Sequence, residues 1–169
     1  MSIRIVFALL PLLSACSKES AAPPAASNTS IVLPASLRLD SAPTPAISVL
    51  DARANAADGS EVILTGRAKD FVATRAVFTM ADMSLKSCAD PEDKMGCETP
   101  WDYCCEDPKR LSQGTVAIEL RDGDKLAMGS AQGWNGLDHL REVVVRGTLK
   151  KDDQGNLTMI AKGVYVKPN

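Results

Sequence analysis

The sequence has very little histidine and few aromatic residues, and both shortages limit what the protein can do. Its 169 residues include one histidine, His139, and aromatic residues make up 4% of the chain. A single histidine excludes a histidine-rich metal site and leaves any histidine-assisted nucleophile dependent on His139 alone. Single-stranded nucleic acid is usually bound by stacking rings in a basic groove. With few aromatics and a formal charge of −2, we expect no nucleic-acid partner.

Sequence motifs for catalysis are also missing. No phosphate-binding glycine loop, serine elbow or metalloprotease helix motif occurs in the chain. His139 is interpreted as a surface residue of a short helical turn. Ordinary surface charge is the expectation for the scattered arginines, which are Arg67, Arg75, Arg121, Arg141 and Arg146. We therefore expect no catalytic activity and no cofactor.

The chain has no apolar run long enough to cross a bilayer, where roughly twenty residues are needed. About nine apolar residues lie between Arg4 and Leu13, and small residues follow them. This pattern predicts a signal peptide over residues 1–15. The tetrapeptide ending at Cys16, LSAC, resembles the lipobox of bacterial lipoproteins. That resemblance implies cleavage before Cys16 and acylation of its thiol and new amino group, which would anchor the protein to a membrane. An ordinary secretory signal with a chance cysteine is the alternative.

The predicted anchor implies a location in the cell envelope. In a cell with two membranes, lipoproteins with Ser17 after the acylated cysteine are expected on the outer membrane, facing the periplasm. Residues 16–45 are rich in Ala, Pro and Ser and bury too little to fold alone, so they are predicted to form a disordered tether. Residues 46–169 have the length of one domain.

Alternating apolar residues predict five strands in this domain, at 61–68, 75–81, 115–120, 142–150 and 157–167. A capping box at Ser48 predicts a helix that ends near Ala56, and a helical turn is expected at 137–140. This order, with a glycine in each of the strands VILTGRA and VVVRGTL, resembles the OB-fold, a small five-stranded Greek-key barrel. A β-sandwich is the alternative. The resemblance concerns the fold and does not specify an activity.

A long insert, at about 82–113, separates the second and third predicted strands. It contains every cysteine other than Cys16. Residues 82–107 hold eight carboxylates against two lysines, a formal charge of −6. A stretch of this length without regular structure is usually functional or stapled.

Three roles are open for Cys88, Cys97, Cys104 and Cys105. The first is a pair of disulfides, since an exported protein meets an oxidising compartment. A bond between the adjacent Cys104 and Cys105 strains their peptide, so Cys88–Cys104 with Cys97–Cys105, or Cys88–Cys105 with Cys97–Cys104, remain possible. The second is a thiolate site for zinc or copper, although no C-x2-C pair is present. The third is thiol redox chemistry, which the surrounding acids disfavour.

The segment TPWDYCC, at 99–105, resembles a motif of uncharacterised bacterial lipoproteins with an OB-like domain. The resemblance implies a family and no reaction. Trp101 and Tyr103 are expected to cover the disulfides, and Trp101, Asp102, Tyr103 and Phe78 are candidates for a binding face. The sequence thus predicts a lipid-anchored, non-enzymatic module whose disulfide-stapled acidic insert contacts an unknown envelope protein or glycan. The alternative is a metal-binding or thiol-redox lipoprotein that uses the same cysteines.

Overall fold

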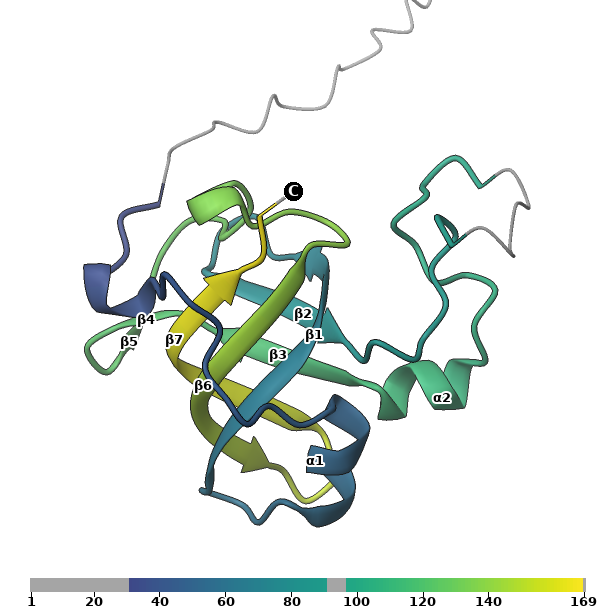
Figure 1. The fold of residues 1–169 in the computed structure, drawn as a ribbon, viewed down its shortest axis with the longest axis horizontal. Coiled ribbons are helices and arrows are strands. Elements are labelled where there is room, and N and C mark those ends of the chain that lie inside the picture. The colour runs from purple at the N-terminus through teal and green to yellow at the C-terminus, as the bar shows by residue number, and fades with distance from the viewer. Residues whose placement is uncertain (1–30, 91–96, 169) are drawn as a thin grey trace, which may run out of the picture.

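A computed structural model describes residues 31–90 and 97–168, which form a closed β-barrel with a long insert on one side (Figure 1). The barrel strands are β1 (Glu61–Phe71), β2 (Val77–Ala81), β3 (Thr115–Glu119), β6 (Glu142–Lys151) and β7 (Leu157–Val166). Their order around the barrel is β1-β2-β3-β7-β6, and pairing of β6 with β1 closes it. Only β3 and β7 run parallel among these pairs. The predicted OB-like five-stranded barrel is confirmed.

Alternation along the strands fills the barrel. On β6, Val143, Val145 and Leu149 point inward and are buried, because successive side chains of a strand lie on opposite faces. The largest side chains of the barrel core come from several elements and include Leu64, Phe78, Met80, Ile118, Leu120, Leu149 and Met159.

The two glycines that suggested strand bending lie where strands approach most closely. A Cβ atom on Gly147 would lie 2.2 Å from the Ile160 carbonyl oxygen, and one on Gly66 would lie 2.5 Å from the Ala81 carbonyl oxygen. The pairing of β6 with β7 also shifts register between Arg146 and Gly147. These glycines permit the backbone contacts that close the small barrel.

The predicted helix before the first strand is α1 (Val49–Asn55), which covers one end of the barrel (Figure 1). Ser48 caps it, since its Oγ accepts a hydrogen bond from the Asp51 amide at 3.0 Å. Val49 and Ala52 are fully buried in the barrel core. The backbone amide of Leu50 donates to Asp82 at 3.1 Å, which connects α1 to the start of the insert.

The helical turn predicted at 137–140 is wrong in position. The turn is η2 (Trp134–Gly136), and Leu137 after it is extended and fully buried in the barrel core. Leu140 has φ of 61°, so a right-handed helix cannot include it. The structure also contains elements that were not predicted from the sequence, which are α2 (Pro108–Gln113) and the hairpin of β4 (Arg121–Asp122) and β5 (Lys125–Leu126).

Part of the predicted tether packs on the barrel. Leu37, at the end of η1 (Ala35–Leu37), is buried, and the Leu39 amide donates to the Val164 carbonyl at 3.0 Å. The packed chain thus begins ahead of residue 46. The predicted signal peptide, Cys16 and the first part of the predicted tether lie outside the described residues. In the part of the chain that is described, no helix has the length and apolar character needed to cross a membrane.

Candidate functional site

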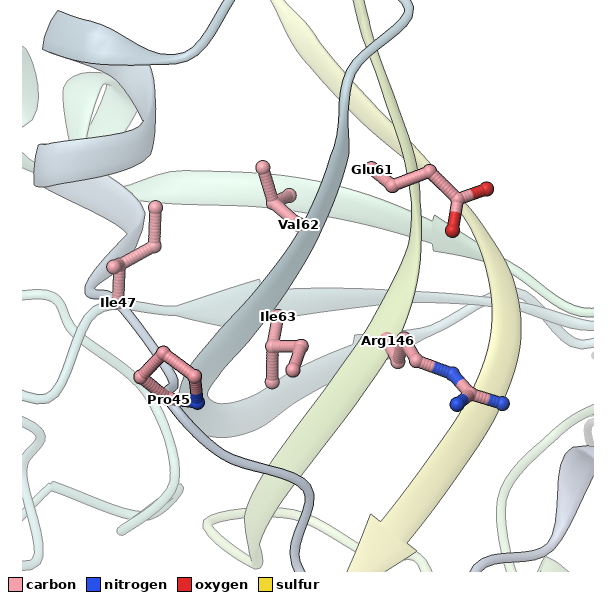
Figure 2. A pocket seen from close by; sticks show the side chains of 6 residues that line it. All are labelled: Pro45, Ile47, Glu61, Val62, Ile63 and Arg146. Atoms are coloured by element: carbon pink, nitrogen blue, oxygen red, sulfur yellow. The ribbon is translucent and has the colours of Figure 1, made fainter.

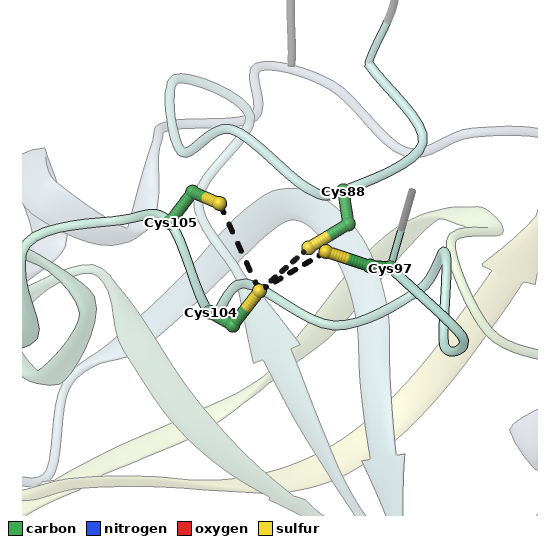
Figure 3. A group of neighbouring side chains, drawn as sticks. All are labelled: Cys88, Cys97, Cys104 and Cys105. Atoms are coloured by element: carbon green, nitrogen blue, oxygen red, sulfur yellow. Dashed lines mark hydrogen bonds between the residues drawn. The ribbon is translucent and has the colours of Figure 1, made fainter. Parts of the chain in front are cut away.

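The four cysteines of the insert converge on one point (Figure 3). The Sγ atom of Cys104 lies 3.1 Å from that of Cys88, 3.3 Å from that of Cys97 and 3.8 Å from that of Cys105. All four sulfur atoms lie within 4.8 Å of one another. A disulfide bond is about 2.05 Å long. The described cysteines are therefore free thiols in contact, and neither predicted disulfide pairing is formed in this structure.

Cys88 is held by an ion pair between the barrel and the insert. Arg67, on β1, donates from Nη1 to both carboxylate oxygens of Asp90, at 3.1 and 3.2 Å. The same carboxylate accepts a hydrogen bond from the Ser87 amide at 2.7 Å, and the Cys88 amide donates to the Asp102 carbonyl at 2.8 Å. These charge-assisted hydrogen bonds hold Asp90 and Ser87 against β1, so the chain on both sides of Cys88 is fixed in place.

Arg67 also reaches the beginning of the insert. Its Nη2 donates to the carbonyl oxygens of Met83 and Leu85, each at 3.3 Å. A single side chain of the barrel wall thus contacts three positions of the insert. The prediction that Arg67 is ordinary surface charge is therefore wrong, because no local pattern indicates its long-range partners.

Cys104 and Cys105 follow a buried anchor. Tyr103 is 1% exposed and packs with Ala81 and Leu85 in a small second core. The next two residues, Cys104 and Cys105, are both exposed. The site therefore has a fixed side at Cys88 and an open side at Cys104 and Cys105.

The thiols differ in acidity. Hydrogen bonds from the thiols of Cys104 and Cys97 lower the pKa of Cys88, because they stabilise its thiolate. The hydrogen bond to Cys88, followed by those to Cys97 and Cys105, raises the pKa of Cys104. The hydrogen bond to Cys88 also raises the pKa of Cys97. Cys88 is thus the member of this trio that ionises most easily.

The four candidate binding residues do not share one surface, because two are buried and two are accessible to solvent. Phe78 is fully buried in the barrel, and Tyr103 is buried in the second core, so neither offers a surface to a ligand. Burial raises the pKa of Tyr103 to about 12, and its hydroxyl has no hydrogen-bond partner among the described residues. Trp101 is 39% exposed. Asp102 is half-buried, and its carboxylate accepts a hydrogen bond from the Tyr103 amide.

His139 joins the insert to the barrel instead of lying on a surface helix. Its ring stacks on Trp101 with 4.9 Å between ring centroids, and it meets the edge of Phe71 at 5.1 Å. Its Nδ1 atom is paired with the Lys69 carbonyl oxygen. These contacts position Trp101 over the barrel. They could not be predicted from the sequence, because the partners are far apart in the chain.

A separate surface pocket lies on the outer face of the barrel (Figure 2). Its volume is about 400 Å³, and it is lined by Pro45, Ile47, Glu61, Val62, Ile63 and Arg146. Glu61 is paired with Lys162. The lining is largely apolar and contains none of the cysteines, so this pocket is distinct from the cysteine cluster.

Similarity to known proteins does not indicate a family or a function for this chain. No protein-family model matches the chain, and no curated protein is significantly similar to it in sequence. The chemistry of the cysteine cluster therefore has to be judged from its own geometry.

Proposed function

We propose that this protein is a lipid-anchored protein of the bacterial cell envelope that binds a thiophilic metal ion through Cys88, Cys97, Cys104 and Cys105. The observation that carries the proposal is the convergence of four sulfur atoms within 4.8 Å of one another. The barrel acts as the scaffold, and the insert supplies the site. No catalytic activity is part of the proposal.

The distances between sulfur atoms suit an ion at their centre. A tetrahedral zinc site with Zn–S bonds of about 2.3 Å has its sulfur atoms about 3.8 Å apart. The Cys104 sulfur lies 3.1, 3.3 and 3.8 Å from the other three. An ion at the centre would require the two closer pairs to separate by roughly 0.5 to 0.7 Å. Thiolate ligands favour zinc and monovalent copper over hard cations such as calcium.

The adjacency of Cys104 and Cys105 does not prevent joint coordination. Their sulfur atoms lie 3.8 Å apart and point toward the same centre (Figure 3). The missing C-x2-C pair is thus replaced by adjacent cysteines that follow a buried tyrosine.

Attachment to a membrane is proposed from the sequence around Cys16. The lipobox-like LSAC and the Pro/Ala/Ser segment that follows are typical of a lipid anchor on a tether. We expect a Cys16→Ala variant to lose labelled palmitate that the wild-type protein incorporates in a bacterial host. Undiminished labelling of the variant would contradict the anchor.

A disulfide-stapled module that binds an envelope protein or glycan is the second candidate. One observation favours it: the sulfur nearest to Cys104 belongs to Cys88 and the next nearest to Cys97, and both contacts occur in the predicted pairings. Each disulfide would contribute roughly 3 kcal/mol in the chain-entropy model.

Intact mass spectrometry of the mature protein, isolated from the envelope, separates the two candidates. We expect native spectra to show one zinc or copper ion per chain, and denatured spectra to show four free thiols in the insert. A mass gain of four hydrogen atoms on reduction, without bound metal, would replace the metal site with two disulfides. A variant with serine at all four positions is the control, since it can form neither.

A further inference from the structure

The geometry points to a metal ion that is carried rather than kept: the cysteine cluster passes its ion directly to thiol or imidazole ligands of a second protein. This transfer rests on the metal-binding function proposed above. The ion is then a cargo that the protein delivers to a partner. It also defines the partner by its chemistry, as a protein with cysteine or histidine ligands on a basic surface.

The fold does not depend on the cluster for support. None of the four cysteines belongs to either hydrophobic core among the described residues. The insert has its own attachments, through the Arg67–Asp90 ion pair and the buried Tyr103. Structural zinc sites usually supply folding free energy to segments that lack such a core. Here that contribution is provided by other contacts.

The cluster is open to an incoming ligand on one side. Cys104 and Cys105 are both exposed, although a structural zinc site normally shields its thiolates. The opposite side is fixed, because Cys88 is held by the ion pair and by its hydrogen bond to the Asp102 carbonyl. A new ligand can therefore approach the ion at Cys104 and Cys105 while Cys88 keeps its position.

The transfer step is a ligand exchange without electron transfer. A thiol of the partner releases its proton and forms a bond to the ion as the bond to the Cys105 sulfur breaks. The released Cys105 thiolate takes up a proton. Repetition at the remaining cysteines moves the ion to the partner, and neither the ion nor any sulfur changes its oxidation state.

The charge around the open side favours a basic partner. Residues 97–107 contain four carboxylates and no lysine or arginine, although one of these carboxylates, that of Glu106, is paired with Arg110. Two of these acids, Glu98 and Asp107, are exposed and follow Cys97 and Cys105 closely in the chain. Complementary charge raises the rate at which two proteins meet, and salt removes this advantage.

Transfer kinetics test the proposal on the full mature protein loaded with zinc or monovalent copper. The acceptors are synthetic Cys-x-x-Cys peptides flanked by lysines or by glutamates. We expect the transfer rate to rise in proportion to acceptor concentration. We also expect the lysine peptide to react about tenfold faster at low salt, with the difference lost at about 0.5 M salt.

Two variants test whether the acidic residues beside the cysteine cluster cause the preference for the lysine peptide. Glu98→Gln is expected to reduce the advantage of the lysine peptide, and Glu61→Gln, on the outer face of β1, is expected to leave all rates unchanged. A rate independent of acceptor concentration, or equal rates for both peptides at low salt, would overturn the carrier role and leave metal binding intact. Failure to load either metal would overturn the proposed function as well.

Discussion

Single glycines set the tightest geometric limits on this protein. At Gly147 the nearest atom to an added Cβ is a backbone oxygen of β7, at 2.2 Å, and a backbone atom cannot move aside as a side-chain end can. Gly123 presents a different constraint. It has φ of 59° in the β4–β5 turn, yet an added Cβ would meet no atom within 4 Å. A side chain at Gly147 is therefore excluded by a steric clash, whereas one at Gly123 is disfavoured only by the backbone conformation.

We expect Gly147→Ala to destabilise the domain by about 2–3 kcal/mol, because the methyl group forces β6 away from β7. Gly123→Ala is the matched control and is expected to cost about 1 kcal/mol, through its backbone conformation alone. Urea denaturation followed by circular dichroism measures both. Equal costs at the two positions would contradict the steric account of Gly147.

The four cysteines show what can be predicted from single residues. Their even number, the acidic residues around them and the predicted signal peptide mark the four cysteines as a candidate site in the sequence. Their mutual distances depend on how residues 82–113 fold against β1, because Cys88 and Cys104 are sixteen positions apart. The sequence therefore left disulfide, metal and redox roles open, whereas the arrangement of free thiols favours metal.

At the scale of elements, contacts between the barrel and the insert hold the four cysteines in position. Arg67 binds Asp90 and two carbonyl groups of the insert, and Trp101 stacks on His139 from the loop before β6. The alternating pattern predicted strand β1, but it could not distinguish Arg67 from other outward-facing arginines. Long-range partners are not encoded in the local periodicity.

We expect Arg67→Ala to weaken metal binding about 10–100-fold, because removing an outer contact that orients a ligand has effects of this size. Competition with a chromogenic chelator measures the affinity, and circular dichroism checks that the barrel remains folded. Arg75→Ala is the control at an exposed arginine ahead of β2. Similar losses in both variants would argue against a positioning role for Arg67.

Asp82 joins α1 to both ends of the insert. It is 3% exposed, its carboxylate accepts hydrogen bonds from the amides of Ser84 and Leu50, and its own amide donates to the Gly114 carbonyl. Burial alone would raise the pKa of Asp82. The hydrogen bonds to its charged form outweigh burial and lower the pKa below its usual value.

A lowered pKa in the folded state makes the ionised form of Asp82 stabilising. This contribution is complete above the unfolded-state pKa of about 4 and is lost as pH falls through the lower folded-state value. We expect Asp82→Asn to cost about 1–3 kcal/mol at pH 7, and this difference from wild type to shrink below about pH 4. Denaturant titrations across pH measure it. Asp153→Asn, in an exposed loop, is the control, and a difference that grows in acid would contradict the prediction.

On the scale of the whole molecule, the barrel and the cysteine cluster are separate in their energetics. The main core contains residues from all five barrel strands, and the insert contributes only a small second core around Tyr103. Figure 1 shows the insert standing away from the barrel beside α2. A loss of the cluster should therefore change metal binding more than folding.

We expect a variant with serine at Cys88, Cys97, Cys104 and Cys105 to fold with a free energy of unfolding within about 1 kcal/mol of the reduced, metal-free wild type. Metal at about 100 times its dissociation constant should stabilise the wild type by about 2.7 kcal/mol and leave the variant unchanged. Thermal unfolding with and without metal measures both. An unfolded variant would show that the cluster is part of the folding core.

Local patterns in the amino-acid sequence predict the barrel, its first helix and the place of the insert, because alternation, capping and turn residues act over short distances. The glycines of β1 and β6 also marked the bends, since only a residue without a side chain fits there. Tertiary structure decided the rest. The helical turn lies at η2, ahead of its predicted position, because Leu137 is buried in the core. Residues 35–39 pack on β7. Phe78 and Tyr103 are buried, so neither offers a surface to a ligand. Tertiary structure also brought the four thiols together, because Arg67 and Trp101's partner His139, which lie far from the cysteines in the chain, fix the insert against the barrel.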